Sequence, residues 1–199
     1  MSTHKGRPDE DVCLIVHDFE SYLPLTKIID LLQSSIKKSV PEACDPKIGN
    51  HVTIVPPFFA NKQLQFGILF GMELRWTGFA SSQFDAEVSY KLSFFKNENC
   101  DYAYLPITFP KDYTVLVTKL RAQIEEHGRW YYDPTGEKWV PHITVSEAFG
   151  LADLVPASLS TSLSKGQRIS VALPVEQPSL MRKVVGGWEK VRFESLRSK

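Results

Sequence analysis

The chain has 199 residues, of which 43% are hydrophobic and 23% are charged, a composition typical of a soluble globular domain. Lysine plus arginine and aspartate plus glutamate number 23 each, so the formal net charge at pH 7 is zero. This balance argues against stable binding to duplex DNA, because that affinity is dominated by neutralisation of phosphates. A small anionic ligand or a short single strand of RNA remains compatible with it.

The cysteines and the apolar runs together predict a cytoplasmic protein. Cys13, Cys44 and Cys100 are scattered and odd in number, which indicates a reducing compartment and argues against a disulfide framework or a zinc site. Residues 1–11 are polar, lack the apolar region of a signal peptide and are expected to be flexible. No apolar run approaches the ~18 residues needed to span a bilayer, so no membrane association is expected.

The first part of the chain predicts a strand, a helix and a second strand. Residues 12–19 form an apolar run that suits a buried strand and is too short for a helix. After Pro24, apolar residues recur at helical spacing until Pro41, which predicts an amphipathic helix that packs on a sheet. A loop over residues 41–50 then leads into a strand over residues 51–55, which Pro56 and Pro57 should stop.

The middle of the chain predicts two helices around a hairpin. Residues 58–76 fit a helix, although Gly67 and Gly71 weaken the pattern. Strands are expected over residues 83–95 and 102–109, with a turn at residues 97–99 between them. Pro110 then precedes the clearest helical pattern in the chain, which ends near His127 and Gly128.

The last part of the chain predicts a strand, a helix and three further strands. The strand covers residues 139–146, the helix residues 151–163, and the final strands residues 168–175, 179–184 and 188–195. Gly186-Gly187 between the last two is a hairpin turn signal. The order of elements repeats roughly, which predicts one α+β domain over residues 1–199, with two pseudo-symmetric lobes of mostly antiparallel sheet, flanking helices and a cleft between the lobes.

A four-residue motif occurs twice, as His51-Val52-Thr53-Ile54 and as His142-Ile143-Thr144-Val145. In a strand, residues i and i+2 lie on the same face, roughly 6–7 Å apart, so each histidine shares a face with its threonine while the apolar residues enter the core. A single strand histidine is usually structural. Two chance copies of this pattern among five histidines would occur about once in a thousand such chains, so the repeat favours a functional pair.

Two imidazoles that converge on a cleft supply a general base and a general acid near neutral pH. The hydroxyls of Thr53 and Thr144 would hydrogen-bond the non-bridging oxygens of a phosphoryl group. This set of side chains favours cleavage of a phosphodiester. Two histidines without a third ligand fall short of a catalytic zinc site, and neither Gly-x-Ser-x-Gly nor a P-loop occurs, so no metal or other cofactor is expected.

The two motifs with their flanks, HVTIVPPF over residues 51–58 and WVPHITV over residues 139–145, resemble the signature of the two-histidine (2H) phosphoesterase superfamily, in particular its 2′-5′ RNA ligase-like and cyclic phosphodiesterase branch. The resemblance is compatible with the order of elements over residues 12–195. It implies a bilobal fold with pseudo-two-fold symmetry, and metal-independent cleavage of 2′-5′ phosphodiester or 2′,3′-cyclic phosphate bonds. It also implies that His51, Thr53, His142 and Thr144 are the catalytic and phosphate-holding residues.

Some members of this superfamily carry an arginine after the motif, whereas Val55-Pro56 and Ser146-Glu147 stand at those places here. Lys138 is the candidate for a replacement cation, although a surface lysine with no such role is the commoner case. A nucleobase needs an aromatic surface on which to stack, and Phe58, Tyr132 and Trp139 are the candidates nearest the motifs in sequence. Some of these aromatic residues are expected in the core instead.

Two alternatives to a nucleotide phosphodiesterase stay open. One is a module that binds a nucleotide or an RNA end without turning it over, for which a pair of titratable groups is unnecessary. The other is an enzyme for a cyclic phosphate that is not a nucleotide. The sequence leaves undetermined which histidine is the acid, the base preference of the site, the oligomeric state, the pathway and whether ligation occurs.

Overall fold

The computed structural model describes residues 6–19, 22–46, 48–77, 84–89, 91–96, 100–131, 140–156, 168–173 and 178–197. The elements in chain order are β1 (Asp11–Asp18), α1 (Leu23–Ser39), β2 (His51–Ala60), α2 (Lys62–Thr77), β3 (Phe84–Ser89), β4 (Ser93–Phe95), β5 (Asp101–Thr108), α3 (Lys111–His127), β6 (Arg129–Trp130), β7 (His142–Ala148), α4 (Leu151–Leu154), β8 (Arg168–Leu173), β9 (Ser179–Val184), β10 (Gly187–Lys190) and α6 (Phe193–Arg197). Helices interspersed with an antiparallel sheet confirm the predicted α+β class.

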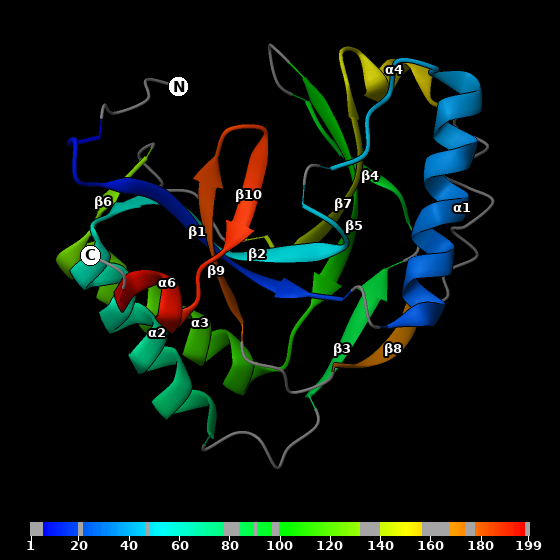
Figure 1. Ribbon diagram of the computed structural model, residues 1–199. Helices are drawn as coiled ribbons and strands as arrows, with labels where there is room; N and C mark the ends of the chain where they lie inside the picture. The colour runs from blue at the N-terminus through cyan, green and yellow to red at the C-terminus, as the bar shows by residue number, and fades with distance from the viewer. Residues whose placement is uncertain are drawn as a thin grey trace.

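The strands form an open sheet in the order β10-β9-β1-β2-β7-β5-β3-β8, with β6 and β4 paired beside this path to β2 and β5. The described strand pairs are antiparallel. The motif strands β2 and β7 are neighbours in the middle of this order. The N-terminal strand β1 and the C-terminal hairpin β9–β10 lie together on the β2 side, while β5, β3 and β8 lie on the β7 side (Figure 1).

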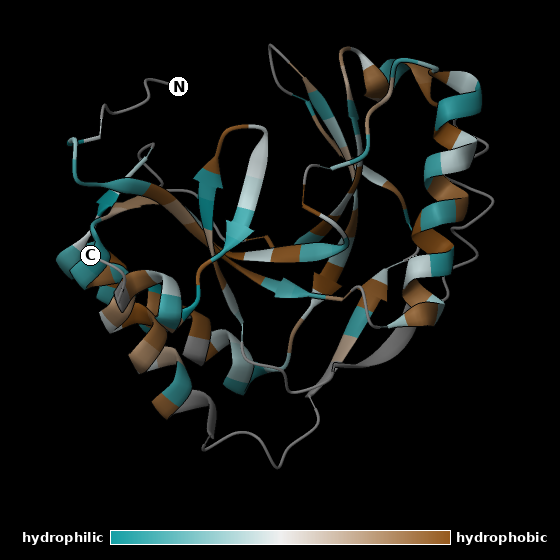
Figure 2. Ribbon diagram, viewed as in Figure 1, coloured by the Kyte–Doolittle hydropathy of each residue, from teal (hydrophilic) through white to brown (hydrophobic). Residues whose placement is uncertain are grey.

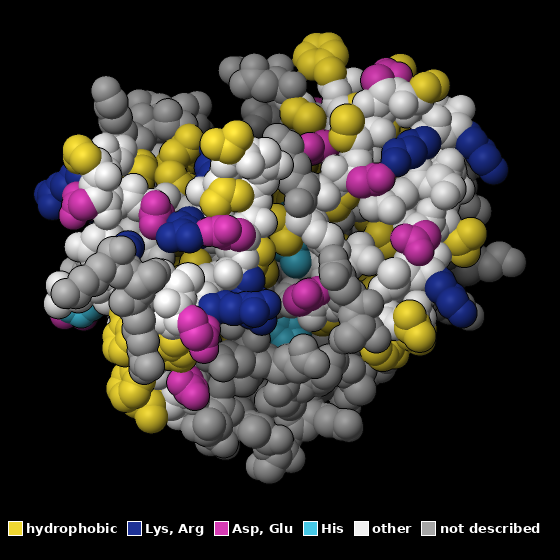
Figure 3. Space-filling model, viewed as in Figure 1, with side chains coloured by type: hydrophobic (Ala, Val, Ile, Leu, Met, Phe, Trp, Pro, Cys, Tyr) yellow, Lys and Arg dark blue, Asp and Glu magenta, His cyan; other side chains and the backbone are white. Residues whose placement is uncertain are grey.

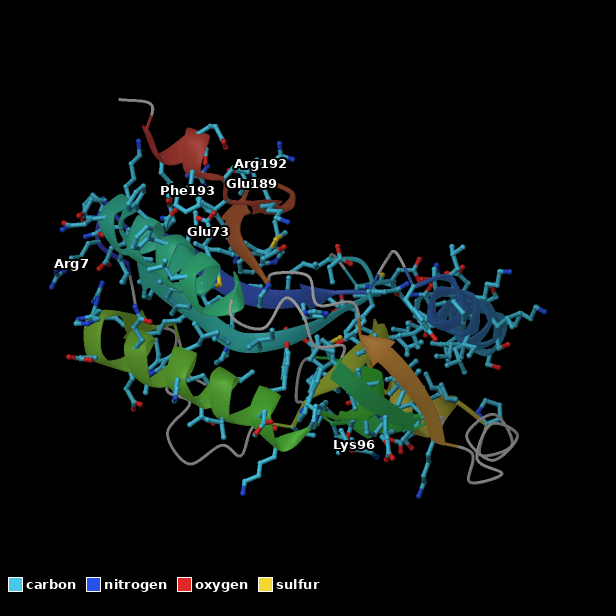
Figure 4. The ribbon with its side chains drawn as sticks, turned by 90° about the horizontal axis from the view of Figure 1, so that it is seen from below. Arg7, Glu73, Lys96, Glu189, Arg192 and Phe193 are labelled. Atoms are coloured by element: carbon cyan, nitrogen blue, oxygen red, sulfur yellow. The ribbon has the colours of Figure 1, made fainter. Side chains whose placement is uncertain are left out.

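Helices flank the sheet in two groups, α1 on one side of the view and α2, α3 and α6 together on the other (Figure 1). Hydrophobic and hydrophilic residues alternate along α1 (Figure 2), and its buried residues recur every three or four positions, at Leu25, Ile29, Leu32 and Ile36. Phe193 of α6 lies beside α2 (Figure 4). Its ring packs edge-on against that of Phe66, with ring centroids 5.4 Å apart.

The first motif strand does not stop at the two prolines. Its pairing with β1 passes from Val55 opposite Ile15 to Phe58 opposite Cys13, and so skips Pro56 and Pro57, whose nitrogens carry no hydrogen to donate. The strand therefore continues to Ala60. Helix α2 begins correspondingly later than predicted, after Asn61, whose Oδ1 accepts a hydrogen bond from the Leu64 amide at 2.9 Å.

Two other predicted strands are divided. Residues 83–95 form β3 and β4, which both pair with β5. Residues 188–195 form the end of β10 and the start of α6, because the Phe193 ring packs on α2 and Ser195 Oγ donates to the Arg192 carbonyl at 2.7 Å. The predicted turn at residues 97–99 lies outside the described residues, as does the end of the predicted helix over 151–163, of which α4 covers Leu151–Leu154.

The other predicted elements are present with small changes at their ends, and Gly186 makes the expected turn between β9 and β10 with φ of 89°. Among the described residues, no helix is both long and apolar enough to cross a membrane.

His17 is a buried histidine on the core face of β1. Its side chain is 2% exposed, and neither ring nitrogen has a hydrogen-bond partner within the described part of the chain. The ring packs against Phe19 at 4.8 Å and meets the Tyr113 ring edge-on at 6.2 Å. Burial lowers the pKa of His17 from 6.5 to about 4, and the charge of Asp18 opposes this shift only in part.

This burial predicts a loss of stability in acid. Between pH 6.5 and about 4 the unfolded chain binds a proton at His17 and the native state does not, so the free energy of unfolding falls as the pH is lowered through this window. The full effect is on the order of 3 kcal/mol. In His17→Phe this part of the pH dependence disappears, whereas His127→Phe, at an exposed position on α3, keeps it. Denaturant unfolding at pH 7, 5.5 and 4.5 measures the difference, and parallel curves for wild type and His17→Phe would contradict it.

Candidate active site

The two motifs lie side by side on adjacent strands. Val52 of β2 pairs with Ile143 of β7 in an antiparallel register, which sets His51 opposite Thr144 and Thr53 opposite His142. All four side chains are partly exposed, while the intervening residues Val52, Ile54, Ile143 and Val145 are fully buried on the other face.

Both imidazoles are held by the backbone in the same way. His51 Nδ1 lies 2.7 Å from the carbonyl oxygen of Gly49, and His142 Nδ1 lies 2.8 Å from that of Val140. A carbonyl oxygen can only accept, so each Nδ1 carries the hydrogen and donates it. The neutral ring then keeps its lone pair on Nε2.

Burial is the main electrostatic effect on His142. It lowers the pKa of His142 from the ordinary value of 6.5, the hydrogen bond to the Val140 carbonyl works in the opposite direction, and the charge of His51 lowers the pKa further. The last effect shows that each imidazole lies within electrostatic range of the other. At pH 7 the His142 ring is consequently neutral and can accept a proton at Nε2.

On the His51 side, β1, β9 and β10 form a pocket of about 260 Å³. Asp18 stands opposite His51 on β1, and Lys190 stands opposite Met181 where β10 pairs with β9. Histidine side chains lie near the centre of the face in Figure 3, with acidic and basic side chains close by. The complete lining is Val16, Asp18, Ile48, Gly49, His51, Ser179, Met181, Trp188 and Lys190.

On the His142 side the surface is aromatic. Phe95 of β4 and Tyr104 of β5 are stacked, with ring centroids 4.1 Å apart and planes inclined by 13°. Both rings meet His142 edge-on, at 5.0 and 5.1 Å. Tyr104 stands opposite Thr144 in the β5–β7 register, so it lies on the same face as the motif residues.

Of the four substrate-binding residues predicted from sequence, one lies in the core and three lie outside the described residues. Phe58 is 0% exposed and belongs to the hydrophobic core, because β2 continues past the prolines and packs between β1 and β6. It has no surface on which a base could stack, and that prediction is wrong. Tyr132, Lys138 and Trp139 lie outside the described residues.

Sequence reasoning missed the residues that flank the histidines in the structure, namely Asp18, Phe95, Tyr104, Trp188 and Lys190. The residue pattern around Tyr104 predicts strand β5, and the Gly186-Gly187 turn predicts the hairpin that carries Trp188 and Lys190. Nothing in the local sequence indicates that these strands approach the motifs. Within the described part of the chain, no group of three or more His, Cys, Asp or Glu side chains is arranged to hold a metal ion.

The sequence matches no protein-family model, and no curated protein matches it significantly. The motif pair and the geometry of its surroundings are therefore the only indications of function in the described part of the chain.

The proximity of the two rings predicts coupled titration. In His51→Gln the charge beside His142 is removed, so the pKa of His142 rises, but it stays below 6.5 because the larger cause, burial, remains. His127→Gln, on α3, leaves the pKa of His142 unchanged. Proton NMR titration of the imidazole resonances measures these values. An identical His142 pKa in wild type and His51→Gln would show that the two rings do not interact.

Proposed function

We propose that this chain is a metal-independent phosphodiesterase that cleaves 2′-5′ phosphodiester or 2′,3′-cyclic phosphate bonds in nucleotides or short RNA by two-histidine acid–base catalysis. The observation that carries the proposal is the pair of imidazoles on adjacent central strands, each held at Nδ1 by a backbone carbonyl and each opposite a threonine. A structural pair of histidines would not need the same backbone support, the same exposed face and the same hydroxyl neighbour twice.

His142 suits the role of general base, because its lowered pKa keeps Nε2 free to accept a proton at pH 7. It takes the proton from the attacking hydroxyl or water, whose oxygen forms a new bond to phosphorus. His51, the other imidazole of the pair, then takes the role of general acid, with Asp18 opposite it on the neighbouring strand. As the bond from phosphorus to the leaving oxygen breaks, His51 gives that oxygen its proton, and exchange with solvent restores both rings.

The threonines and one lysine complete the phosphate site in this proposal. Thr53 and Thr144 each stand opposite one of the histidines and donate hydrogen bonds to the non-bridging oxygens as charge redistributes. Lys190, in the pocket that also contains His51, supplies a cation on that side. It takes the place that the sequence suggested for Lys138.

We further propose that the fold is the bilobal two-histidine fold, with β2 and β7 as equivalent central strands. Two observations support it. The motif strands occupy the middle of the sheet, and each has one antiparallel neighbour on its outer side, β1 for β2 and β5 for β7. The rest of the sheet then divides into a β9–β10 half and a β3–β8 half.

The first test is substitution of each histidine. His51→Ala and His142→Ala should each lower kcat by about 10²–10⁴-fold, because each removes one proton transfer from the transition state. His127→Ala, on α3, is the matched control and should keep wild-type activity. The assay is mass spectrometry of the products formed from 2′-5′-linked and 3′-5′-linked dinucleotides and from 2′,3′-cyclic nucleotides, in the presence of a chelator.

Nearly full activity in either histidine variant would refute the two-histidine mechanism. Stoichiometric binding of a nucleotide that stays unchanged after long incubation would instead favour a binding module. A panel that includes cyclic sugar phosphates separates a nucleotide enzyme from one that acts on another cyclic phosphate.

The second test is the pH dependence of kcat/KM, which should be bell-shaped. On the acid side activity is lost as the pH falls through the pKa of His142, below 6.5, because the base becomes protonated. On the alkaline side activity is lost as the acid gives up its proton. The two apparent pKa values belong to the coupled pair. Initial rates between pH 5 and 9 in chelator measure the profile, and a flat profile over this range would exclude acid–base catalysis by these histidines.

A further inference from the structure

The pocket beside His51 has the chemistry of a nucleobase site. Trp188 and Met181 offer a flat aromatic and a polarizable surface, Asp18 can accept hydrogen bonds from base or ribose donors, and Ser179 can donate them. Its volume of about 260 Å³ lies just below the ~300–1,000 Å³ of sites for drug-sized ligands. A single base with part of its ribose suits this space better than a longer piece of RNA.

The aromatic pair beside His142 offers a second stacking surface. Phe95 and Tyr104 are already stacked on each other at 4.1 Å, so little conformational freedom is lost when a third ring joins them. Both side chains are partly exposed, and Tyr104 lies on the motif face opposite Thr144. This surface is aromatic, whereas the pocket beside His51 also contains a carboxylate and an ammonium group.

The two surfaces lie on opposite sides of the motif residues. The pocket is built by β1, β9 and β10, which continue the sheet outward from β2, whereas Phe95 and Tyr104 belong to β4 and β5, which lie beyond β7. In Figure 1 the β9–β10 hairpin lies to the left of strands β4 and β5. A phosphorus atom between His51 and His142 would therefore have the pocket on one side and the aromatic pair on the other.

We infer that the preferred substrate has a nucleoside on both sides of the scissile phosphate, one in the pocket of Trp188 and one on the Phe95–Tyr104 pair. This inference rests on the proposed function, and it selects a linear linkage between two nucleosides over a 2′,3′-cyclic mononucleotide. A cyclic mononucleotide has one base and can occupy one of the two surfaces only. Stacking on one aromatic side chain is worth roughly ten- to hundredfold in binding, so the second base makes a measurable difference.

The experiment compares two substrates, adenylyl-(2′→5′)-adenosine and adenosine 2′,3′-cyclic phosphate, with wild type, Trp188→Ala and Phe95→Leu. For the dinucleotide, each substitution should lower kcat/KM by about tenfold or more, mainly through KM. For the cyclic mononucleotide, at most one of the two substitutions should have this effect. Trp188→Phe should restore most of the loss, because it keeps a stacking ring.

Phe95 also touches His142, so its substitution needs a readout that separates stacking from displacement of the imidazole. A displaced His142 would lower kcat on both substrates, whereas a lost base contact raises KM on the dinucleotide. Phe70→Ala serves as the control for removal of an aromatic ring, since Phe70 is 51% exposed on α2 and belongs to neither surface.

Two outcomes would overturn the two-nucleoside inference and leave the proposed phosphodiesterase activity intact. One is equal kcat/KM of the wild type for both substrates, and the other is a kcat/KM for the dinucleotide that Trp188→Ala or Phe95→Leu leaves unchanged. If wild type turns over neither substrate, the proposed function fails and calorimetric binding of the dinucleotide decides the inference. Binding that both Trp188→Ala and Phe95→Leu weaken would support two base sites, and absence of binding would overturn them.

Discussion

The pairing of Val52 with Ile143 is the contact on which the candidate site depends. It joins β2 to β7 at one residue pair, and a slip by a single residue would turn one motif toward the core. Such a slip would expose two aliphatic side chains of the displaced strand and bury its histidine and threonine. The burial of Val52, Ile54, Ile143 and Val145 therefore opposes it. Beyond this pair, other groups complete the hydrogen bonding of β7: Gln33 Nε2 donates to the Val145 carbonyl at 3.0 Å, and Cys44 and Glu147 exchange backbone hydrogen bonds. Helix α1 and the loop after it thus hydrogen-bond to the part of β7 that does not pair with β2.

Three histidines on adjacent strands show how the surroundings decide what an imidazole can do. His17, which pairs with Val52, lies on the core face among aromatic rings and is kept neutral by burial. His51 and His142 lie on the opposite face, where one nitrogen of each ring is fixed by a carbonyl and the ring remains partly exposed. The first arrangement costs stability in acid, and the second leaves a nitrogen able to exchange protons with a ligand. Because successive side chains of a strand point to opposite faces, His17, which stands opposite Val52, points to the core and not to the face of the motif residues.

Local pattern predicted those parts of the structure that local physics determines. The alternation in the two motifs placed His51, Thr53, His142 and Thr144 on one face, and the helical spacing in residues 24–40 and 111–127 predicted α1 and α3. The pairing of the C-terminal hairpin with β1 could not be predicted, because it joins Cys13 to Arg182 across nearly the whole chain. For the same reason the residues beside the histidines were missed. Proximity in sequence suggested Phe58, which is in the core, while Trp188 and Tyr104 reach the site through strand order.

The repeat makes the two histidines chemically alike, and the strands around them make them different. Each has the same hydrogen bond at Nδ1 and the same hydroxyl opposite, so the motifs alone assign no direction to proton transfer. Asp18 beside His51 supplies a negative charge, whereas Pro106 stands opposite His142 on β5 and two aromatic rings contact it. Burial lowers the pKa of His142 and favours its neutral ring. Under the proposed function, this asymmetry lets one ring act as the base and the other as the acid on one bond, and the surfaces beside the two rings differ in the same way.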